Sequence, residues 1–144
     1  MDYERFIKVA HKNIAVSNEV IKNKAQEMGL SYGEATAIMF FAKNPQLSTA
    51  AHMVKECGVS KAFASKIMLS LMKKKLVTIT TDQKDKRNHI ITLSKTAVDI
   101  AEAVEKAFYE HLAYVMGGLT DNEENVLSHI ITKLEKNIEE KISR

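Results

Sequence analysis

Apolar residues recur at every third or fourth position in several long stretches of the chain, which is the spacing of one helix face. The first stretch predicts an amphipathic helix over residues 4–28, and Gly29 after it is suited to ending a helix. Two more stretches follow the capping residues Ser94 and Thr120 and predict long helices towards the C-terminus. The spacing therefore predicts a mainly α protein with long helices at both ends.

Shorter helices are predicted in the middle of the chain, where polar capping residues precede the apolar stretches. Ser31 and Glu34 form a capping box before a helix that ends ahead of residue 44. Ser48 is expected to cap a two-turn helix that ends at Gly58, and Ser60 to cap a helix that runs to about residue 74. Two helices joined by a short turn that contains glycine are typical of a helix-turn-helix.

Two β-branched segments of strand length, residues 76–80 and 89–93, follow the helix-turn-helix. The polar residues 81–88 between them predict a hairpin with a long cationic tip. A helix-turn-helix followed by such a hairpin is a winged helix, whose second helix can enter the major groove of DNA. The predicted fold class is therefore mainly α with a small β-hairpin wing.

The chain of 144 residues with 45% apolar content fits a single domain with a hydrophobic core. Its apolar runs are far shorter than the roughly 20 residues of a membrane span, so we expect no membrane partner. The N-terminus does not resemble a secretory signal, and the single cysteine fits a reducing compartment. We therefore expect a cytoplasmic protein.

The net charge of +3 is distributed unevenly along the chain. Residues 55–95 carry ten basic and three acidic side chains, whereas residues 96–144 carry five basic and ten acidic ones. Such a basic segment is typical of a phosphate-binding surface, although a solvated lysine face has the same composition. Its organisation as a winged helix favours the phosphate-binding surface.

The exposed face of the second helix of the helix-turn-helix is suited to DNA. Its lysines can contact phosphates, its serines can donate to phosphates or base edges, and Ala62 and Phe63 can touch thymine methyl groups. Because this face has no Arg, Asn or Gln, we expect sequence preference to depend on methyl contacts and DNA shape. The candidate residues are Ser60, Lys61, Ala62, Phe63, Ser65, Lys66, Ser70 and Lys73.

The wing carries the second group of candidate DNA-binding residues. Arg87 is suited to a narrow, electronegative minor groove, and Asp85 is close enough in sequence to orient its guanidinium through a bidentate pair. Lys84 and Lys86 would add phosphate contacts. The alternative is a solvated hairpin in which Asp85 and Arg87 only neutralise each other.

Several of these segments together resemble the multiple-antibiotic-resistance regulator (MarR) family. The most specific is the wing, where Asp82, Asp85 and Arg87 match the family pattern of Asp, two residues, Asp, one residue, Arg. Two departures are Lys75 and Ala97, which stand where the family usually has glycine. The other matching segments are Leu47–Thr49, Cys57–Ser60, Leu71–Val77 and Leu93–Ala97.

The resemblance implies a homodimeric winged-helix transcription regulator. Members of the family are mostly repressors that bind palindromic operators, and they are often released by small anionic or phenolic ligands or by thiol oxidation. Carried over to this sequence, the resemblance implies that residues 60–73 form the recognition helix. It also implies that Arg87, braced by Asp85, enters the minor groove.

The apolar stripes of the first and last helices are larger than a winged helix can cover. We therefore expect a homodimer that pairs through residues 1–28 and 98–142 and binds a pseudo-palindrome. In this organisation residues 30–95 are the DNA-binding region, and residues 1–29 and 96–144 are the helical dimerisation region of one domain.

The remaining reactive side chains do not indicate catalysis. Cys57 is expected to be a buried, inert thiol rather than a redox sensor. The five histidines lack metal-ligand spacing and no nucleophile or phosphate-binding motif is present, so we expect neither an enzyme nor a bound metal or cofactor. The resemblance also implies a small-molecule effector as a further partner. The rival hypothesis is a winged helix used for protein interaction without specific DNA binding.

Overall fold

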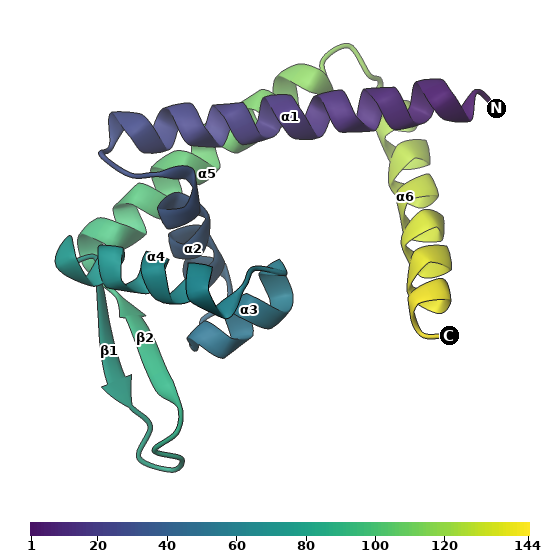
Figure 1. Cartoon of the computed structure of the whole chain (residues 1–144). Coiled ribbons are helices and arrows are strands. Elements are labelled where there is room, and N and C mark those ends of the chain that lie inside the picture. Colours follow the sequence, from purple (N-terminus) through teal and green to yellow (C-terminus); the bar gives the residue numbers. More distant parts are fainter. The chain divides into compact units, whose positions relative to one another are not determined.

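The computed structural model describes residues 1–144 and contains six helices and one antiparallel two-stranded sheet (Figure 1). The predicted fold class, mainly α with a β-hairpin wing, is confirmed. None of the helices combines the length and the apolar character needed to cross a bilayer. The elements in chain order are α1 (Tyr3–Glu27), α2 (Tyr32–Lys43), α3 (Ala50–Cys57), α4 (Lys61–Lys73), β1 (Val77–Thr81), β2 (His89–Leu93), α5 (Lys95–Val115) and α6 (Asp121–Ile142).

The chain divides into two compact units, Met1–His111 and Leu112–Arg144. The first unit contains the hydrophobic core, to which α1 to α5 and the sheet all contribute. Ile38 of α2, Leu71 of α4 and Val104 of α5 are its largest fully buried side chains. In the second unit α6 buries none of its residues.

The predicted capping residues begin most of the helices. The capping boxes at Ser31 and Thr120 are both formed, and the Ser60 hydroxyl accepts a hydrogen bond from the Phe63 amide at 3.0 Å. The prediction that Ser48 caps α3 is wrong, because the cap is Thr49, which accepts from the His52 amide at 3.2 Å.

The neighbouring strand explains the shift of this cap by one residue. The Ser48 carbonyl accepts a hydrogen bond from the Ile91 amide at 2.7 Å, and Thr49 forms an isolated bridge with Ile90. Residues 48 and 49 therefore lie extended beside β2, so the helix begins only after Thr49. Two adjacent hydroxyl residues in the sequence do not reveal this strand contact.

Two helices, α1 and α4, end in the same hydrogen-bond pattern. In each, the amides of the two residues after the cap bond back to carbonyls of the last helical turn, which is a Schellman motif. The motif requires a left-handed residue, which is Gly29 after α1 with φ +76° and Lys75 after α4 with φ +58°. Lys75 thus occupies a conformation that favours glycine.

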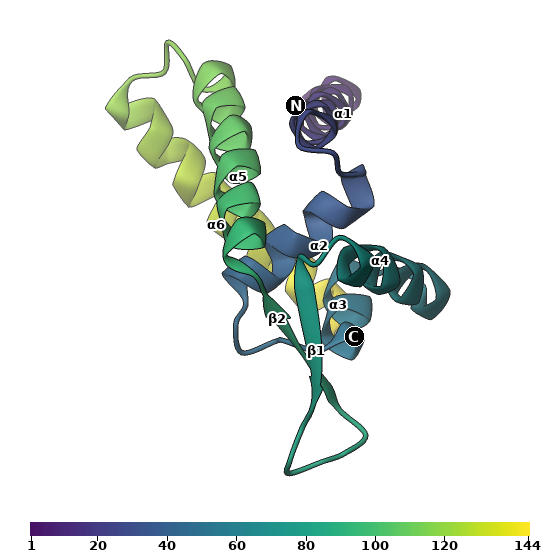
Figure 2. The ribbon, with the colours of Figure 1, turned by 90° about the vertical axis from the view of Figure 1, so that its left-hand side faces the viewer.

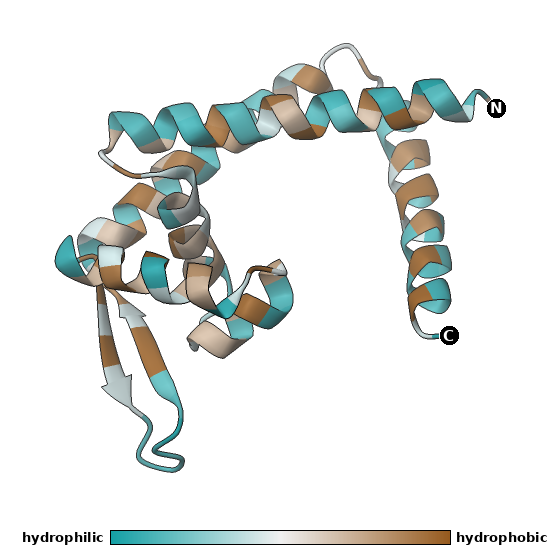
Figure 3. Ribbon diagram, viewed as in Figure 1, coloured by the Kyte–Doolittle hydropathy of each residue, from teal (hydrophilic) through white to brown (hydrophobic).

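The hairpin extends away from the helices of the first unit (Figures 1 and 2). Its strands pair in register from Val77 opposite Leu93 to Thr81 opposite His89. Val77 and Ile91 are buried in the core and anchor the base of the hairpin. The loop between the strands is hydrophilic throughout, as the hydropathy colouring shows (Figure 3).

Candidate nucleic-acid interface

Helix α4 divides into a buried face and an exposed face, as predicted. It packs against α2, α3 and β1 through Ala64, Ile67, Met68 and Leu71, all of which are buried. This packing fixes which side of the helix faces solvent. The predicted DNA-binding residues that are exposed are Ser60, Lys61, Ala62, Phe63, Ser65, Lys66 and Lys73.

The exposed face of α4 is cationic, and no acidic side chain of the protein neutralises its lysines. The helix contains no acidic residue, and Lys61, Lys66 and Lys73 form no salt bridge or side-chain hydrogen bond within the chain. Their ammonium groups are therefore free to bind phosphate oxygens without breaking a contact.

Ser70 differs from the other candidates on this helix. It is half-buried, and its hydroxyl donates to Glu34 Oε2 at 3.0 Å. The expectation that this hydroxyl donates to DNA is corrected, because its proton is engaged within the protein. The helical spacing of α4 alone does not reveal that α2 covers this position.

At the tip of the wing, Asp85 and Arg87 form the predicted bidentate pair. Arg87 Nε donates to Asp85 Oδ1 and its terminal nitrogen donates to Oδ2, both at 3.0 Å, and the Arg87 amide also donates to Oδ1 at 3.1 Å. These hydrogen bonds lower the pKa of Asp85, and the carboxylate raises the pKa of Arg87. The Arg87 side chain is 90% exposed, so Asp85 fixes the orientation of a guanidinium that remains in contact with solvent.

The other cations of the wing are also accessible. Lys84 and Lys86 are exposed and form no salt bridge. The Lys84 amide donates to Asp82 Oδ1 at 2.9 Å, so the first aspartate of the wing pattern stabilises the turn of the loop. In the wing pattern, Asp82 therefore stabilises the backbone of the loop, and Asp85 holds both the amide and the guanidinium of Arg87.

The prediction that Cys57 is buried is wrong, because it is exposed at the end of α3. Partial burial of the sulfur, together with the nearby Glu56 carboxylate, raises the pKa of the thiol. A raised pKa leaves less thiolate near neutral pH, so the site lacks the activation of a reactive cysteine. Nor does any group of three or more His, Cys, Asp or Glu side chains converge as a metal site.

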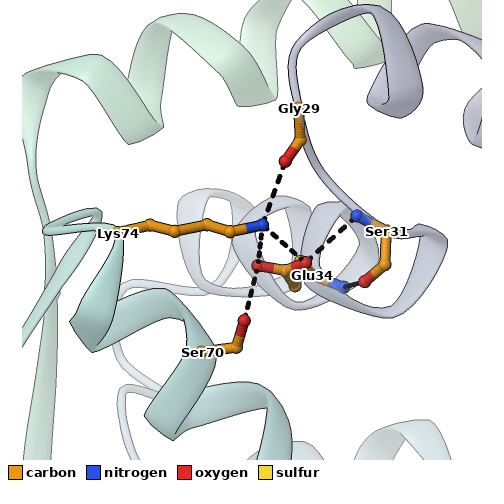
Figure 4. A network of polar contacts seen from close by, with 5 residues as sticks. All are labelled: Gly29, Ser31, Glu34, Ser70 and Lys74. Atoms are coloured by element: carbon orange, nitrogen blue, oxygen red, sulfur yellow. Dashed lines mark hydrogen bonds and ion pairs between the residues drawn. The ribbon is translucent and has the colours of Figure 1, made fainter.

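An ion pair between the buried Glu34 and the partly exposed Lys74, at the end of α4, is the feature that the sequence interpretation missed. Lys74 Nζ lies 2.9 Å from Glu34 Oε2 and 3.0 Å from Oε1, and it also donates to the Gly29 carbonyl at 2.9 Å (Figure 4). The capping box identified Glu34, but its partner lies 40 residues further along the chain. No local pattern connects the two.

The pKa of Glu34 is lowered in this environment. Burial by itself raises the pKa, but hydrogen bonds from Lys74, Ser31 and Ser70 to the charged carboxylate outweigh it. Glu34 is therefore ionised at neutral pH although its side chain is only 6% exposed.

A helix-turn-helix followed by an antiparallel wing defines a winged-helix protein. Within this class, residues 28–88 match the sequence model of the MarR family. The match covers α2 to β1 and the wing tip with its Asp82, Asp85 and Arg87.

Solved structures agree with this match. A MarR family transcriptional regulator from Listeria monocytogenes, complexed with 26mer DNA, is similar with a TM-score of 0.77 and 18% identity over 98% of this chain and 91% of that chain. A MarR protein from Peptoclostridium difficile has a TM-score of 0.77 and 23% identity, with the same coverage. MepR from S. aureus, solved as a DNA complex, has a TM-score of 0.72 and 17% identity over 95% of this chain and 98% of that chain.

At these identities the structures show a shared fold. Together with the family match over the winged helix, they confirm the resemblance to the MarR family that the sequence indicated.

Proposed function

We propose that this chain is a DNA-binding transcription regulator that inserts α4 into the major groove and Arg87 into the minor groove. The observation that carries the proposal is the acid-free lysine face of α4, which belongs to the same winged helix as a solvent-exposed arginine oriented by Asp85. Similar MarR regulators solved with DNA support the same partner.

The exposed side chains have distinct roles in this proposal. Lysines of α4 and of the wing neutralise phosphates and supply most of the sequence-independent affinity. Ser60 and Ser65 donate to phosphates or base edges, while Ala62 and Phe63 contact thymine methyl groups. Arg87 reads the width and potential of the minor groove. The phosphate-binding lysines are Lys61, Lys66, Lys73, Lys84 and Lys86.

We further propose that the regulator is a homodimer. Apolar and polar residues alternate along α6 (Figure 3), and six of its apolar side chains are between 41% and 78% exposed. A second copy would remove these side chains from water and would present two recognition helices to half-sites about ten base pairs apart. The side chains are Val126, Ile130, Ile131, Leu134, Ile138 and Ile142.

The regulatory part of the proposal rests on the family resemblance. We propose that the dimer acts in the cytoplasm as a repressor and that a small ligand or a stress signal releases it from DNA. A reporter gene placed behind a bound operator would test this part, because a repressor lowers its expression and an activator raises it.

Selection of duplexes from random oligonucleotides by the purified full-length protein tests the DNA-binding proposal. We expect recovery of a pseudo-palindrome, and its affinity is expected to fall with a log-log salt slope of about −0.9 for each phosphate contact. Recovery of no preferred sequence, with affinity that does not respond to salt, would instead favour a winged helix used for protein interaction.

A further inference from the structure

Glu34 is the one charged residue that the chain buries, and every polar atom of its carboxylate is used. Oε1 accepts from the Ser31 amide at 3.1 Å and from Lys74 Nζ at 3.0 Å. Oε2 accepts from the Ser70 hydroxyl at 3.0 Å and lies 2.9 Å from Lys74 Nζ (Figure 4). A single carboxylate therefore joins the first turn of α2 to the last turn of α4.

Lys74 extends this connection to the end of α1. Its ammonium group contacts both carboxylate oxygens and the carbonyl of Gly29, in the turn between α1 and α2. An ammonium has three N–H donors, and three oxygens are already within hydrogen-bond distance. These contacts direct the Lys74 ammonium group towards Glu34 and Gly29, whereas the neighbouring Lys73 forms no salt bridge or side-chain hydrogen bond within the chain.

A second observation places α2 directly against the other end of α4. A Cβ added at Gly33 would lie 2.9 Å from Phe63 Cζ and 2.9 Å from Ile67 Cδ1, so the first turn of α2 touches the first half of α4. Contacts from one turn of α2 thus extend along α4 from Phe63 to Lys74. The recognition helix is held against this turn at both ends.

An ion pair that includes a buried charge is seldom a net source of stability, but its directional contacts can specify geometry. We propose that Glu34 and Lys74 are positioning residues that set the orientation of α4 against the α1–α2 turn, so that discrimination between DNA sequences depends on them although neither contacts DNA. This inference rests on the proposed DNA-binding function.

The experiment compares two duplexes, one selected from random oligonucleotides by the wild-type protein and one of the same composition with scrambled sequence. Lys74→Met and Glu34→Gln are each expected to weaken binding of the selected duplex by about tenfold or more, the cost of roughly one lost base contact. Binding of the scrambled duplex is expected to stay within about twofold, because it depends on phosphates. The double variant is expected to be no weaker than the weaker-binding single variant, because both changes remove the same contact.

Three control variants separate positioning from other roles. Lys73→Met is expected to weaken both duplexes and to reduce the salt slope by about 0.9, as a phosphate contact does. Lys74→Arg retains a cation for Glu34 and is expected to restore most of the discrimination. Val104→Ala removes buried apolar volume in α5 and is expected to lower the Tm while leaving the affinity of the folded protein for both duplexes unchanged.

Two results would overturn the inference. One is unchanged discrimination in folded Lys74→Met, and the other is equal weakening of both duplexes with the smaller salt slope of a phosphate contact. Should Glu34→Gln not fold, Lys74→Met decides alone, since the Lys74 side chain is 39% exposed. If the wild-type protein selects no sequence, it is the proposed DNA-binding function that fails, so the two failures are distinguishable.

Discussion

Two residues of the winged helix have unusual conformations, Lys75 in its backbone and Arg87 in its exposed side chain. Lys75 adopts a left-handed conformation at the end of α4, at a position where glycine has no steric cost. Arg87 stays 90% exposed while two of its nitrogens are held by Asp85. Ordering an exposed arginine in advance reduces the side-chain entropy that is lost when it binds.

Replacing Lys75 by glycine is expected to stabilise the protein by about 0.5–1 kcal/mol, because the left-handed strain is relieved. Urea unfolding followed by circular dichroism measures the change. In the interior of α4, Lys66→Gly is expected to have the opposite effect and to cost about 1 kcal/mol. A Lys75→Gly protein that is less stable than wild type would show that the Lys75 side chain makes a stabilising contribution larger than the strain.

Arg87→Ala is expected to weaken binding of the selected duplex by about 1 kcal/mol or more, since a minor-groove arginine contributes to sequence-specific affinity. Fluorescence anisotropy titration measures the loss. Arg87→Lys retains the charge but cannot form the bidentate pair with Asp85, so it is expected to recover only part of the affinity. Equal affinity of wild type and Arg87→Ala would remove Arg87 from the interface.

At the scale of the elements, contacts at its two ends determine the length of α4 and its orientation against α2. The Ser60 cap begins it, the Schellman motif at Lys75 ends it, and the ion pair between Glu34 and Lys74 fixes its last turn against α2. Because the pKa of Glu34 is lowered in the folded state, its ionised form stabilises the fold. This contribution is fully present above the ordinary glutamate pKa and is lost as the pH falls through the folded value.

The stability difference between wild type and Glu34→Gln is therefore expected to be constant above about pH 4.5 and to shrink as the pH falls below it. Chemical unfolding at a series of pH values measures this difference. Glu102→Gln, at an exposed position without a salt bridge, is a matched control for which the difference should stay near zero. A difference for Glu34→Gln that does not change with pH would mean that its charge does not stabilise the fold.

At the scale of the whole molecule, the first unit has a core and the second presents apolar side chains to solvent. The N-terminal half of α1 has the same property, since Phe6, Ile7 and Ile14 are each more than half exposed. Exposed apolar area on this scale is typical of a surface that another chain covers. The proposed homodimer would cover the exposed apolar side chains of both α1 and α6.

Light scattering at micromolar concentration is expected to give about twice the chain mass of 16.2 kDa. Leu134→Glu places a charge in the apolar stripe of α6 and is expected to shift the protein towards monomer and to weaken binding to the two-half-site duplex. Thr132→Glu adds the same charge on the polar side of α6 and should leave the dimer intact. A monomeric wild type that protects a single half-site would contradict the dimer.

The sequence by itself determined the elements, because capping residues, helical spacing and β-branched runs act over a few neighbouring positions. For the same reason it identified the winged helix, the lysine face of α4 and the pairing of Asp85 with Arg87, which are two residues apart.

Only the tertiary structure decided which segments meet. In the folded chain Thr49 rather than Ser48 caps α3, and Cys57 is exposed. The Ser70 hydroxyl donates to Glu34, which also binds Lys74, 40 residues further along the chain. These outcomes depend on contacts between elements that are distant in sequence, and a contact of that kind leaves no periodic or local pattern in the chain.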